Sequence, residues 1–165
     1  MSVKEFVLKK LEENRGIPLS GEAIANSLSV SRAAVWKAVR ALEAEGYHIE
    51  AVPNQGYTLC TDNDLLSTQG ILPYLTPPLK SREIRVFPCL PSTNQEAKRM
   101  ALESAEQGSA VLAEEQSAGR GRLGRSFFSP RGNGLYMSVI LRPKADVSNA
   151  VLITTAAAVG VCRAI

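Results

Sequence analysis

Hydrophobic residues follow a helical spacing through the N-terminal part of the chain, with two polar interruptions. The spacing predicts a first helix that ends near Asn14-Arg15-Gly16 and has a buried stripe of Val3, Phe6, Val7 and Leu11. A second helix, capped by Ser20, buries Ile24 and Leu28. A third helix, capped by Ser31 and ended by Gly46, carries its stripe at Ala34, Val35, Ala38, Val39 and Leu42.

Alternating residues replace the helical spacing on both sides of Pro53-Asn54-Gln55-Gly56, which predicts a β-hairpin from Tyr47 to Leu59. Three helices, with a tight turn between the second and the third, are followed by a hairpin. This arrangement describes a winged helix-turn-helix domain over residues 1–61. Its third helix is the candidate for insertion into a DNA groove, and the hairpin tip adds amide side chains. The predicted DNA-binding residues are Ser31, Arg32, Ala33, Trp36, Lys37, Arg40, Asn54 and Gln55. The alternative is an ordinary solvated helix face, with Trp36 packed against the wing.

A connecting segment is predicted over residues 62–82. It contains a short helix, which Thr76-Pro77-Pro78 ends. A second domain is predicted over 83–165. It begins with a strand at 82–90 and a helix that starts after Ser92-Thr93-Asn94, runs to about Glu106 and is ended by Gly108. Strands at 110–113 and 135–141 and a final helix from about Ser148 complete an α+β domain with a mixed sheet.

Composition narrows the class of protein only slightly. The chain has 165 residues, 45% of them hydrophobic, and a net charge of +3, which by itself does not indicate polyanion binding. No apolar run is long enough to span a membrane, and we expect a cytoplasmic protein without a secretion signal. The cysteines Cys60, Cys89 and Cys162 lack metal-ligand spacing, so we expect reduced structural thiols and no metal site. His48 is expected to be a surface residue of the hairpin.

The segment Gly119-Arg120-Gly121-Arg122-Leu123-Gly124-Arg125 combines three glycines with three arginines. Glycine permits close backbone approach to a ligand, and arginine suits carboxylate and phosphate oxygens, so the loop is typical of anion binding. Residues 119–124 match G-x-G-x-x-G, but the following segment contains Pro130 and two glycines and cannot form the helix of a dinucleotide site. P-loop and protein-kinase signatures are absent. A flexible RG-type nucleic-acid arm is the remaining alternative.

These motifs together resemble the biotin protein ligase family, in particular its bifunctional members that also repress the biotin operon. The resemblance covers nearly the whole chain. It rests on the segment 31–37, the wing 52–57, Ser92-Thr93-Asn94, Gln116, the glycine-arginine loop, and Phe128-Ser129-Pro130 followed by Gly134-Leu135-Tyr136. Lipoate ligases share that fold but not this loop. The implied fold of the second domain is that of the class II synthetases.

The resemblance implies a two-step reaction. Biotin and MgATP give biotinoyl-5′-AMP and pyrophosphate, and a lysine of a biotin carboxyl-carrier protein domain then attacks the mixed anhydride. Other implied partners are operator DNA and, in some family members, a second copy of the chain. The residues implied for biotin are Ser92, Thr93, Asn94, Gln116, Gly119, Arg120, Gly121 and Arg122. Those implied for ATP or the adenylate are Arg122, Gly124, Arg125 and Phe127, with Arg120 and Arg122 as the catalytic pair.

Two positions depart from the family pattern: Leu123 stands where the loop often has another arginine, and Phe127 stands where an indole is common. The family's catalytic domain also continues beyond Ile165, so we expect a chain that ends within that domain. Taken alone, Ser92-Thr93-Asn94 is an ordinary helix cap. A second function remains open, that of a DNA-binding regulator that senses a small ligand without catalysis. A third is an unrelated nucleic-acid-binding protein that uses the RG loop.

Overall fold

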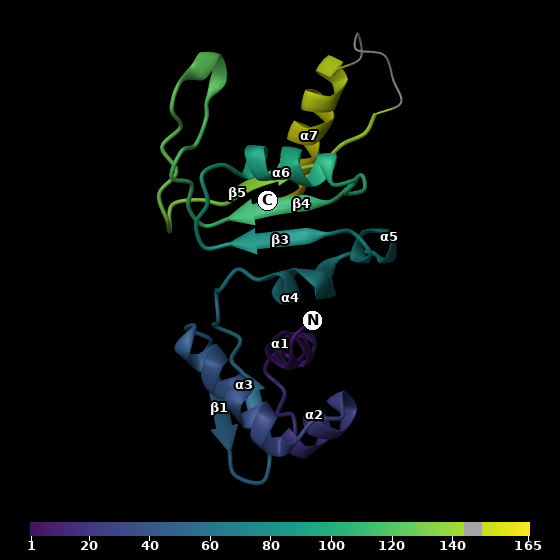
Figure 1. The fold of residues 1–165 in the computed structure, drawn as a ribbon, viewed down its shortest axis with the longest axis vertical. Helices are drawn as coiled ribbons and strands as arrows, with labels where there is room; N and C mark the ends of the chain where they lie inside the picture. The colour runs from purple at the N-terminus through teal and green to yellow at the C-terminus, as the bar shows by residue number, and fades with distance from the viewer. Residues whose placement is uncertain (144–149) are drawn as a thin grey trace.

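The computed structural model describes residues 1–143 and 150–165 (Figure 1). Its N-terminal part contains α1 (Val3–Glu13), α2 (Gly21–Leu28) and α3 (Arg32–Ala44). Each helix starts at a serine whose side chain accepts a backbone N–H, and Ser2 and Glu5 form a reciprocal capping box on α1. Gly46 follows α3 with a φ of +97°. The three predicted helices are therefore confirmed.

The predicted hairpin is present as β1 (Ile49–Val52) and β2 (Gly56–Leu59), which pair antiparallel. Leu19 and Tyr57 exchange two backbone hydrogen bonds of 2.9 Å, which attach the segment before α2 to the outer side of β2. Gly56 lies at this junction with a φ of +109°, and a Cβ there would approach the Leu19 carbonyl oxygen to 2.0 Å. Only glycine fits this position.

The N-terminal helices and the hairpin enclose one hydrophobic core. The prediction for α1 was wrong at one position, because Phe6 is 37% exposed whereas Leu8 is buried. The stripe of α1 is centred on Val7 and Leu11, which face α3, and this rotation turns Phe6 outward. The buried core residues are Val7, Leu8, Leu11, Ile24, Ala25, Val35, Ala38, Val39, Leu42, Tyr47, Ile49 and Leu59.

The connecting segment holds three short helical turns, α4 (Thr68–Ile71), a 3₁₀ turn (Leu72–Tyr74) and α5 (Pro77–Lys80). The prolines predicted to end a helix instead open α5, where their missing N–H groups cost nothing. In Figure 1, α4 lies between α1 and β3, and it contacts both. Thr68 also donates its hydroxyl to the Ile84 carbonyl at 3.1 Å, which ties the segment to the sheet.

A mixed three-stranded sheet in the order β3-β4-β5 forms the second part of the chain. β3 (Ile84–Phe87) pairs parallel with β4 (Ala110–Ala113), which pairs antiparallel with β5 (Tyr136–Val139). The helix α6 (Thr93–Leu102) crosses over one face of the sheet, as Figure 1 shows. The buried residues between them are Leu90, Ala97, Met100, Ala105, Val111, Ala113 and Ile140.

α6 ends four residues earlier than predicted. Ser104 adopts a left-handed φ of +71°, which stops the helix after Leu102. Ala105 still lies in the core, because its N–H returns to the Met100 carbonyl at 3.0 Å. Gly108 does not end the helix. It has a φ of +90° and donates its N–H to the Ile140 carbonyl at 2.9 Å, which leads the chain into β4.

The sheet face opposite α6 is only partly covered in the described structure. The pairing register places Leu112 and Met137 side by side on this face, with Val139 beside Ala110. Met137 and Val139 are 52% and 44% exposed. The last helix, α7 (Ala150–Ala164), is apolar and largely exposed, and the predicted start at Ser148 falls outside the described residues. Among the described helices, none is both long and apolar enough to cross a membrane.

Candidate functional site

The N-terminus of α6 is capped by a residue from another element. Ser92 occupies the N-cap position and is 3% exposed, but its side chain makes no capping hydrogen bond. The side-chain oxygen of Gln116 instead accepts the Thr93 backbone N–H at 2.8 Å and the Thr93 hydroxyl at 3.1 Å. The polar groups that usually satisfy a helix start are therefore supplied by the segment after β4.

Gln116 is held in place by isolated β-bridges to backbone segments on both sides of it. A parallel bridge joins it to Leu90, and an antiparallel bridge joins it to Ser129, whose carbonyl accepts the Gln116 N–H at 3.0 Å. Its side-chain amide donates to the Ser129 hydroxyl at 3.0 Å. Both ends of the Gln116 side chain are thus engaged, so its donor and acceptor have fixed directions. Such a paired donor and acceptor suits a planar amide or urea.

The glycine-arginine segment forms a narrow hairpin. Gly121 donates its N–H to the Arg125 carbonyl at 2.7 Å, and Phe127 donates to the Gly119 carbonyl at 2.8 Å. The turn is made by Leu123 and Gly124, with φ values of +57° and +76°. In Figure 1 this hairpin, drawn in green, extends well beyond the end of the sheet. Leu123 at its tip is 95% exposed.

Gly119 joins the base of this hairpin to the Gln116 cluster. A Cβ at Gly119 would lie 2.4 Å from the Phe127 carbonyl oxygen, 2.7 Å from the Ser129 hydroxyl and 3.3 Å from the Gln116 amide nitrogen. These distances are shorter than van der Waals contact, and one of the neighbouring atoms belongs to the backbone. The close packing therefore requires glycine at this position.

The structure brings some of the predicted ligand residues together and leaves others apart. Thr93, Gln116 and Gly119 belong to one hydrogen-bonded or closely packed cluster, and buried Ser92 adjoins it in the chain. Phe127 meets this cluster through its backbone, because its N–H donates to the Gly119 carbonyl at 2.8 Å and its own carbonyl accepts the Ser129 hydroxyl at 3.1 Å. Asn94, Arg120, Gly124, Arg125 and Phe127 are exposed, Gly121 is half-buried, and the Arg122 side chain lies outside what the structure describes.

Sequence reasoning missed Ser138 as part of the cluster. Its hydroxyl donates to the Thr93 hydroxyl at 2.9 Å from β5. Alternation along β5 contained the signal, because Tyr136, Ser138 and Ile140 share the face on which α6 packs. A polar residue between two apolar ones on a covered face needs a partner, and Thr93 provides it.

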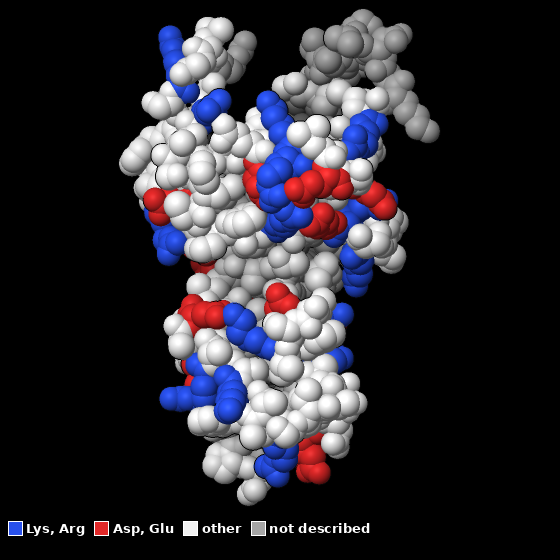
Figure 2. All heavy atoms as spheres, viewed as in Figure 1, with Lys and Arg blue, Asp and Glu red and all other residues white. Residues whose placement is uncertain are grey.

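An ion-pair network lies on the exposed surface of α6 and links this helix to β3. Arg85 on β3 contacts Glu96 at 3.0 Å, and Glu96 contacts Arg99 at 2.6 Å. Hydrogen bonds from Arg99 and then Arg85 lower the pKa of the Glu96 carboxyl, against the opposing effect of desolvation. In Figure 2 this network shows as intermixed blue and red spheres over α6. It secures α6 to β3.

The predicted DNA-binding residues occupy one exposed region of the N-terminal domain. Figure 2 shows blue side chains over α3. Arg32, Ala33, Lys37 and Arg40 are exposed, and Trp36 is 53% exposed. Ser31 caps α3 through the Ala34 N–H, and Arg40 pairs with Glu43 at 2.8 Å. Asn54 and Gln55 are exposed at the wing tip.

A groove of about 480 Å³ runs between the wing and the starts of α2 and α3. Its lining includes Arg32 from α3, Asn54 and Gln55 from the wing tip, and Glu22 from α2. The groove thus joins the two sets of predicted DNA-binding residues. A second cleft, of about 640 Å³, lies between the connecting segment and residues 131–135, and neither Thr93 nor Gln116 lines it.

Two segments of the chain match known families. Residues 3–58 match a family described as HTH domain, and residues 86–165 match the Biotin/lipoate A/B protein ligase family. The protein Bifunctional ligase/repressor BirA of Bacillus subtilis (strain 168) is 38% identical over 147 residues, 89% of this chain and 45% of that protein. The protein of the same name from Escherichia coli (strain K12) is 38% identical over 123 residues, 74% of this chain and 37% of that protein.

The chain spans less than half the length of these curated relatives. A crystal structure of the biotin protein ligase of Leishmania major in complex with biotinyl-5-AMP is 40% identical over 38% of this chain and 23% of that chain, with a TM-score of 0.32. That score is too low for a comparison of the folds. The matches therefore assign residues 86–165 to the Biotin/lipoate A/B protein ligase family and residues 3–58 to a helix-turn-helix domain, and the relatives that match across both segments are named Bifunctional ligase/repressor.

Proposed function

We propose that this chain acts in a biotin protein ligase that also represses transcription from operator DNA. The observation that carries the ligase part is the Thr93–Gln116 cap, a fixed donor-acceptor pair at a helix N-terminus beside a glycine-arginine loop. The relatives' name, Bifunctional ligase/repressor, supports both activities. The two separate hydrophobic cores support a division into residues 1–61, a connecting segment 62–82, and residues 83–165 of the ligase domain.

Biotin is the proposed first substrate. Its ureido ring presents one carbonyl acceptor and two N–H donors, which complement the amide of Gln116, the hydroxyl of Thr93 and the buried start of α6. Ser92 and Asn94 flank Thr93 at the start of α6 and belong to the same proposed subsite. Unpaired N–H groups at a helix start favour the partial negative charge of a carbonyl oxygen.

The glycine-arginine loop is proposed to bring the reacting groups together. MgATP is the second substrate, and its α-phosphate must approach the biotin carboxylate although both groups are anionic. Arg120 and Arg122 would screen this repulsion and stabilise the negative charge that develops in the transition state. The carboxylate oxygen attacks the α-phosphorus, pyrophosphate leaves, and biotinoyl-5′-AMP remains.

Closure of the same hairpin would protect the adenylate. The extended hairpin must fold toward the Gln116 cluster for Gly121, Gly124, Arg125 and Phe127 to reach the nucleotide. Exclusion of water then prevents hydrolysis of the mixed anhydride until a carrier-protein lysine attacks its carbonyl carbon and releases AMP. In this scheme Phe127 provides an apolar wall, and Leu123 at the tip makes no charged contact.

Adenylate formation tests the ligase proposal directly. Biotin-dependent exchange of labelled pyrophosphate into ATP would be measured with the wild-type sequence and with Arg122→Ala, in a protein extended to the relatives' length. We expect Arg122→Ala to lower exchange by at least tenfold while biotin still binds. Equal exchange and equal adenylate lifetime in the two proteins would remove Arg122 from the proposed role.

A second function is supported by the exposure of α3 and by the extended position of the hairpin. The chain would then be a DNA-binding regulator that senses biotin or its adenylate without catalysis. Gel shifts on an operator with two half-sites, with and without ligand, measure this regulation, and binding should weaken steeply with salt. Biotin transfer to a carrier domain distinguishes the enzyme from the pure sensor.

A further inference from the structure

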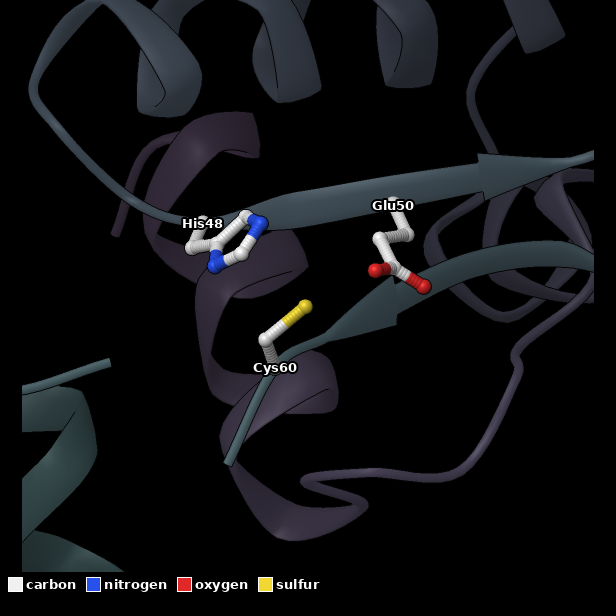
Figure 3. Close-up of side chains that lie close together, drawn as sticks. All are labelled: His48, Glu50 and Cys60. Carbon is white, nitrogen blue, oxygen red and sulfur yellow. The ribbon is translucent and has the colours of Figure 1, made fainter. Parts of the chain in front are cut away.

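We propose that the outer face of the wing carries a zinc-binding site formed by His48, Glu50 and Cys60. One potential ligand atom from each of these residues lies within 4.8 Å of the other two, and Figure 3 shows the three side chains converging on one face of the hairpin. Nothing in the proposed ligase or repressor function uses these side chains. The site is therefore independent of those functions.

The strand register of the wing explains why the three side chains meet. Ile49 pairs with Leu59, and both side chains are buried in the core below the hairpin. Their neighbours His48, Glu50 and Cys60 must point to the opposite, outer face, because successive side chains alternate. Cys60 also lies directly across from His48, to whose carbonyl it donates its N–H at 2.9 Å. Backbone pairing thus fixes the positions of all three Cα atoms.

Asp62 orients the histidine ring for a metal ion. Both Asp62 carboxylate oxygens lie near His48 Nδ1, at 3.2 and 3.3 Å. This contact favours the tautomer with the proton on Nδ1 and leaves the Nε2 lone pair available for a metal. Figure 3 shows the His48 ring beside Cys60, with Glu50 farther along the same face of the hairpin. Carboxylate–histidine–metal arrangements of this kind are typical of zinc sites.

The ligand set favours a divalent ion of intermediate softness. One thiolate, one imidazole and one carboxylate match the preferences of Zn²⁺, whereas Mg²⁺ and Ca²⁺ prefer oxygen ligands alone. Ligand atoms around tetrahedral zinc are roughly 3.3–3.8 Å apart, given bonds of about 2.0–2.3 Å. His48 and Glu50 are exposed, so small side-chain rotations can close the present separation. A water molecule would complete the four ligands.

The carboxylates of Glu50 and Asp62 place negative charge beside Cys60 and His48, which favours a cation at this position. Zinc binding replaces the thiol proton, so Cys60–SH and Zn²⁺ give a Cys60–S⁻–Zn²⁺ bond and one released proton. Bound zinc would link β1, β2 and the segment that leaves the wing.

Cobalt titration tests the site, because Co²⁺ bound to thiolate gives a charge-transfer band in the near ultraviolet. The reduced, metal-free chain would be titrated with Co²⁺ and then with Zn²⁺. We expect a saturable band with one equivalent of Co²⁺, tetrahedral visible bands, and displacement of cobalt by Zn²⁺. Cys60→Ser should abolish the charge-transfer band, and Asp62→Asn should weaken binding by about tenfold or more.

Cys89→Ser is the matched control, since Cys89 is an exposed free cysteine in the other part of the chain. This variant should keep the full signal. Zn²⁺ should also raise the unfolding temperature of the wild-type chain but not of Cys60→Ser, with circular dichroism confirming that both are folded. A missing charge-transfer band, or a band that survives in Cys60→Ser, would overturn the proposal.

Discussion

The side-chain oxygen of Gln116 accepts both the backbone N–H and the hydroxyl of Thr93, at 2.8 and 3.1 Å. Gln116 thereby performs for α6 the role that an N-cap serine usually performs, while Ser92 remains buried without a capping bond. A ligand carbonyl that approaches the start of α6 competes with the Gln116 oxygen for these donors. Ligand binding and the stability of α6 are therefore linked through one side chain.

Replacement of this cap should destabilise the second domain. Gln116→Ala leaves the Thr93 N–H and hydroxyl without their acceptor and removes the donor to the Ser129 hydroxyl, and the loss of a helix cap costs about 1–2 kcal/mol. Thermal unfolding followed by circular dichroism measures the effect. Ser117→Ala, at the exposed neighbouring position, serves as the control and should unfold like the wild type. Equal stability of Gln116→Ala would show that the cap contributes nothing.

Glycine at position 119 should be essential to the base of the loop. In Gly119→Ala the new Cβ meets the Phe127 carbonyl oxygen at 2.4 Å, so the hairpin must shift, at a cost of about 1–3 kcal/mol. Gly121→Ala tests specificity, because its Cβ finds its nearest neighbour at 3.4 Å. In chemical denaturation, the free energy of unfolding should be lower for Gly119→Ala than for Gly121→Ala. The reverse order contradicts the packing described for the loop base.

The pH dependence of stability should report the Glu96 network. The pKa of Glu96 lies below its ordinary value of 4.5, so the network stabilises the fold above that pH. The contribution is lost as the pH falls through the depressed folded-state pKa. Glu96→Gln should therefore lower the unfolding temperature at pH 7, and the difference from wild type should shrink toward pH 3. A difference that stays constant over this range would exclude the ionic contribution.

The wing offers one substitution that should destabilise the N-terminal domain and one that should leave its stability unchanged. Gly56→Ala places a Cβ 2.0 Å from the Leu19 carbonyl at a positive φ, which should destabilise the N-terminal domain by roughly 2–4 kcal/mol. Asn54→Gly removes a tip side chain at a φ of +62°, where glycine is favoured, so stability should be kept. If the wing contacts DNA, Asn54→Gly lowers operator affinity in a gel shift without unfolding. Unchanged affinity would remove Asn54 from the DNA interface.

Local sequence signals predicted most of the fold. The serine caps at positions 20 and 31, the glycine at 46 and the alternation around 53–56 determine the winged-helix elements through short-range geometry. The errors occurred where tertiary contacts decided the outcome. Ser104 ends α6 in a left-handed conformation, and the segment to Gly108 then follows hydrogen bonds to Met100 and Ile140. No local pattern specifies those partners.

The candidate sites likewise divide into residues that the sequence pattern identified and residues that only tertiary contacts bring together. Gln116 and Gly119 were identified from their place in a family-like motif, whereas the Ser138 contact with Thr93 depends on strand register and helix placement. The cluster of His48, Glu50 and Cys60 was also missed, since the spacing between these residues matches no linear metal motif. Only the pairing of β1 with β2 brings Cys60 opposite His48.

The binding of biotin to this chain tests the central claim most directly, because the claim assigns the ligand to Thr93 and Gln116. Calorimetric titration would compare the wild-type chain with Gln116→Ala, after circular dichroism has confirmed that both are folded. We predict saturable binding of one biotin per wild-type chain, tightened by MgATP, and a loss of at least tenfold in affinity for Gln116→Ala. Absence of binding by the folded wild-type chain, or equal affinity in both proteins, would contradict this assignment.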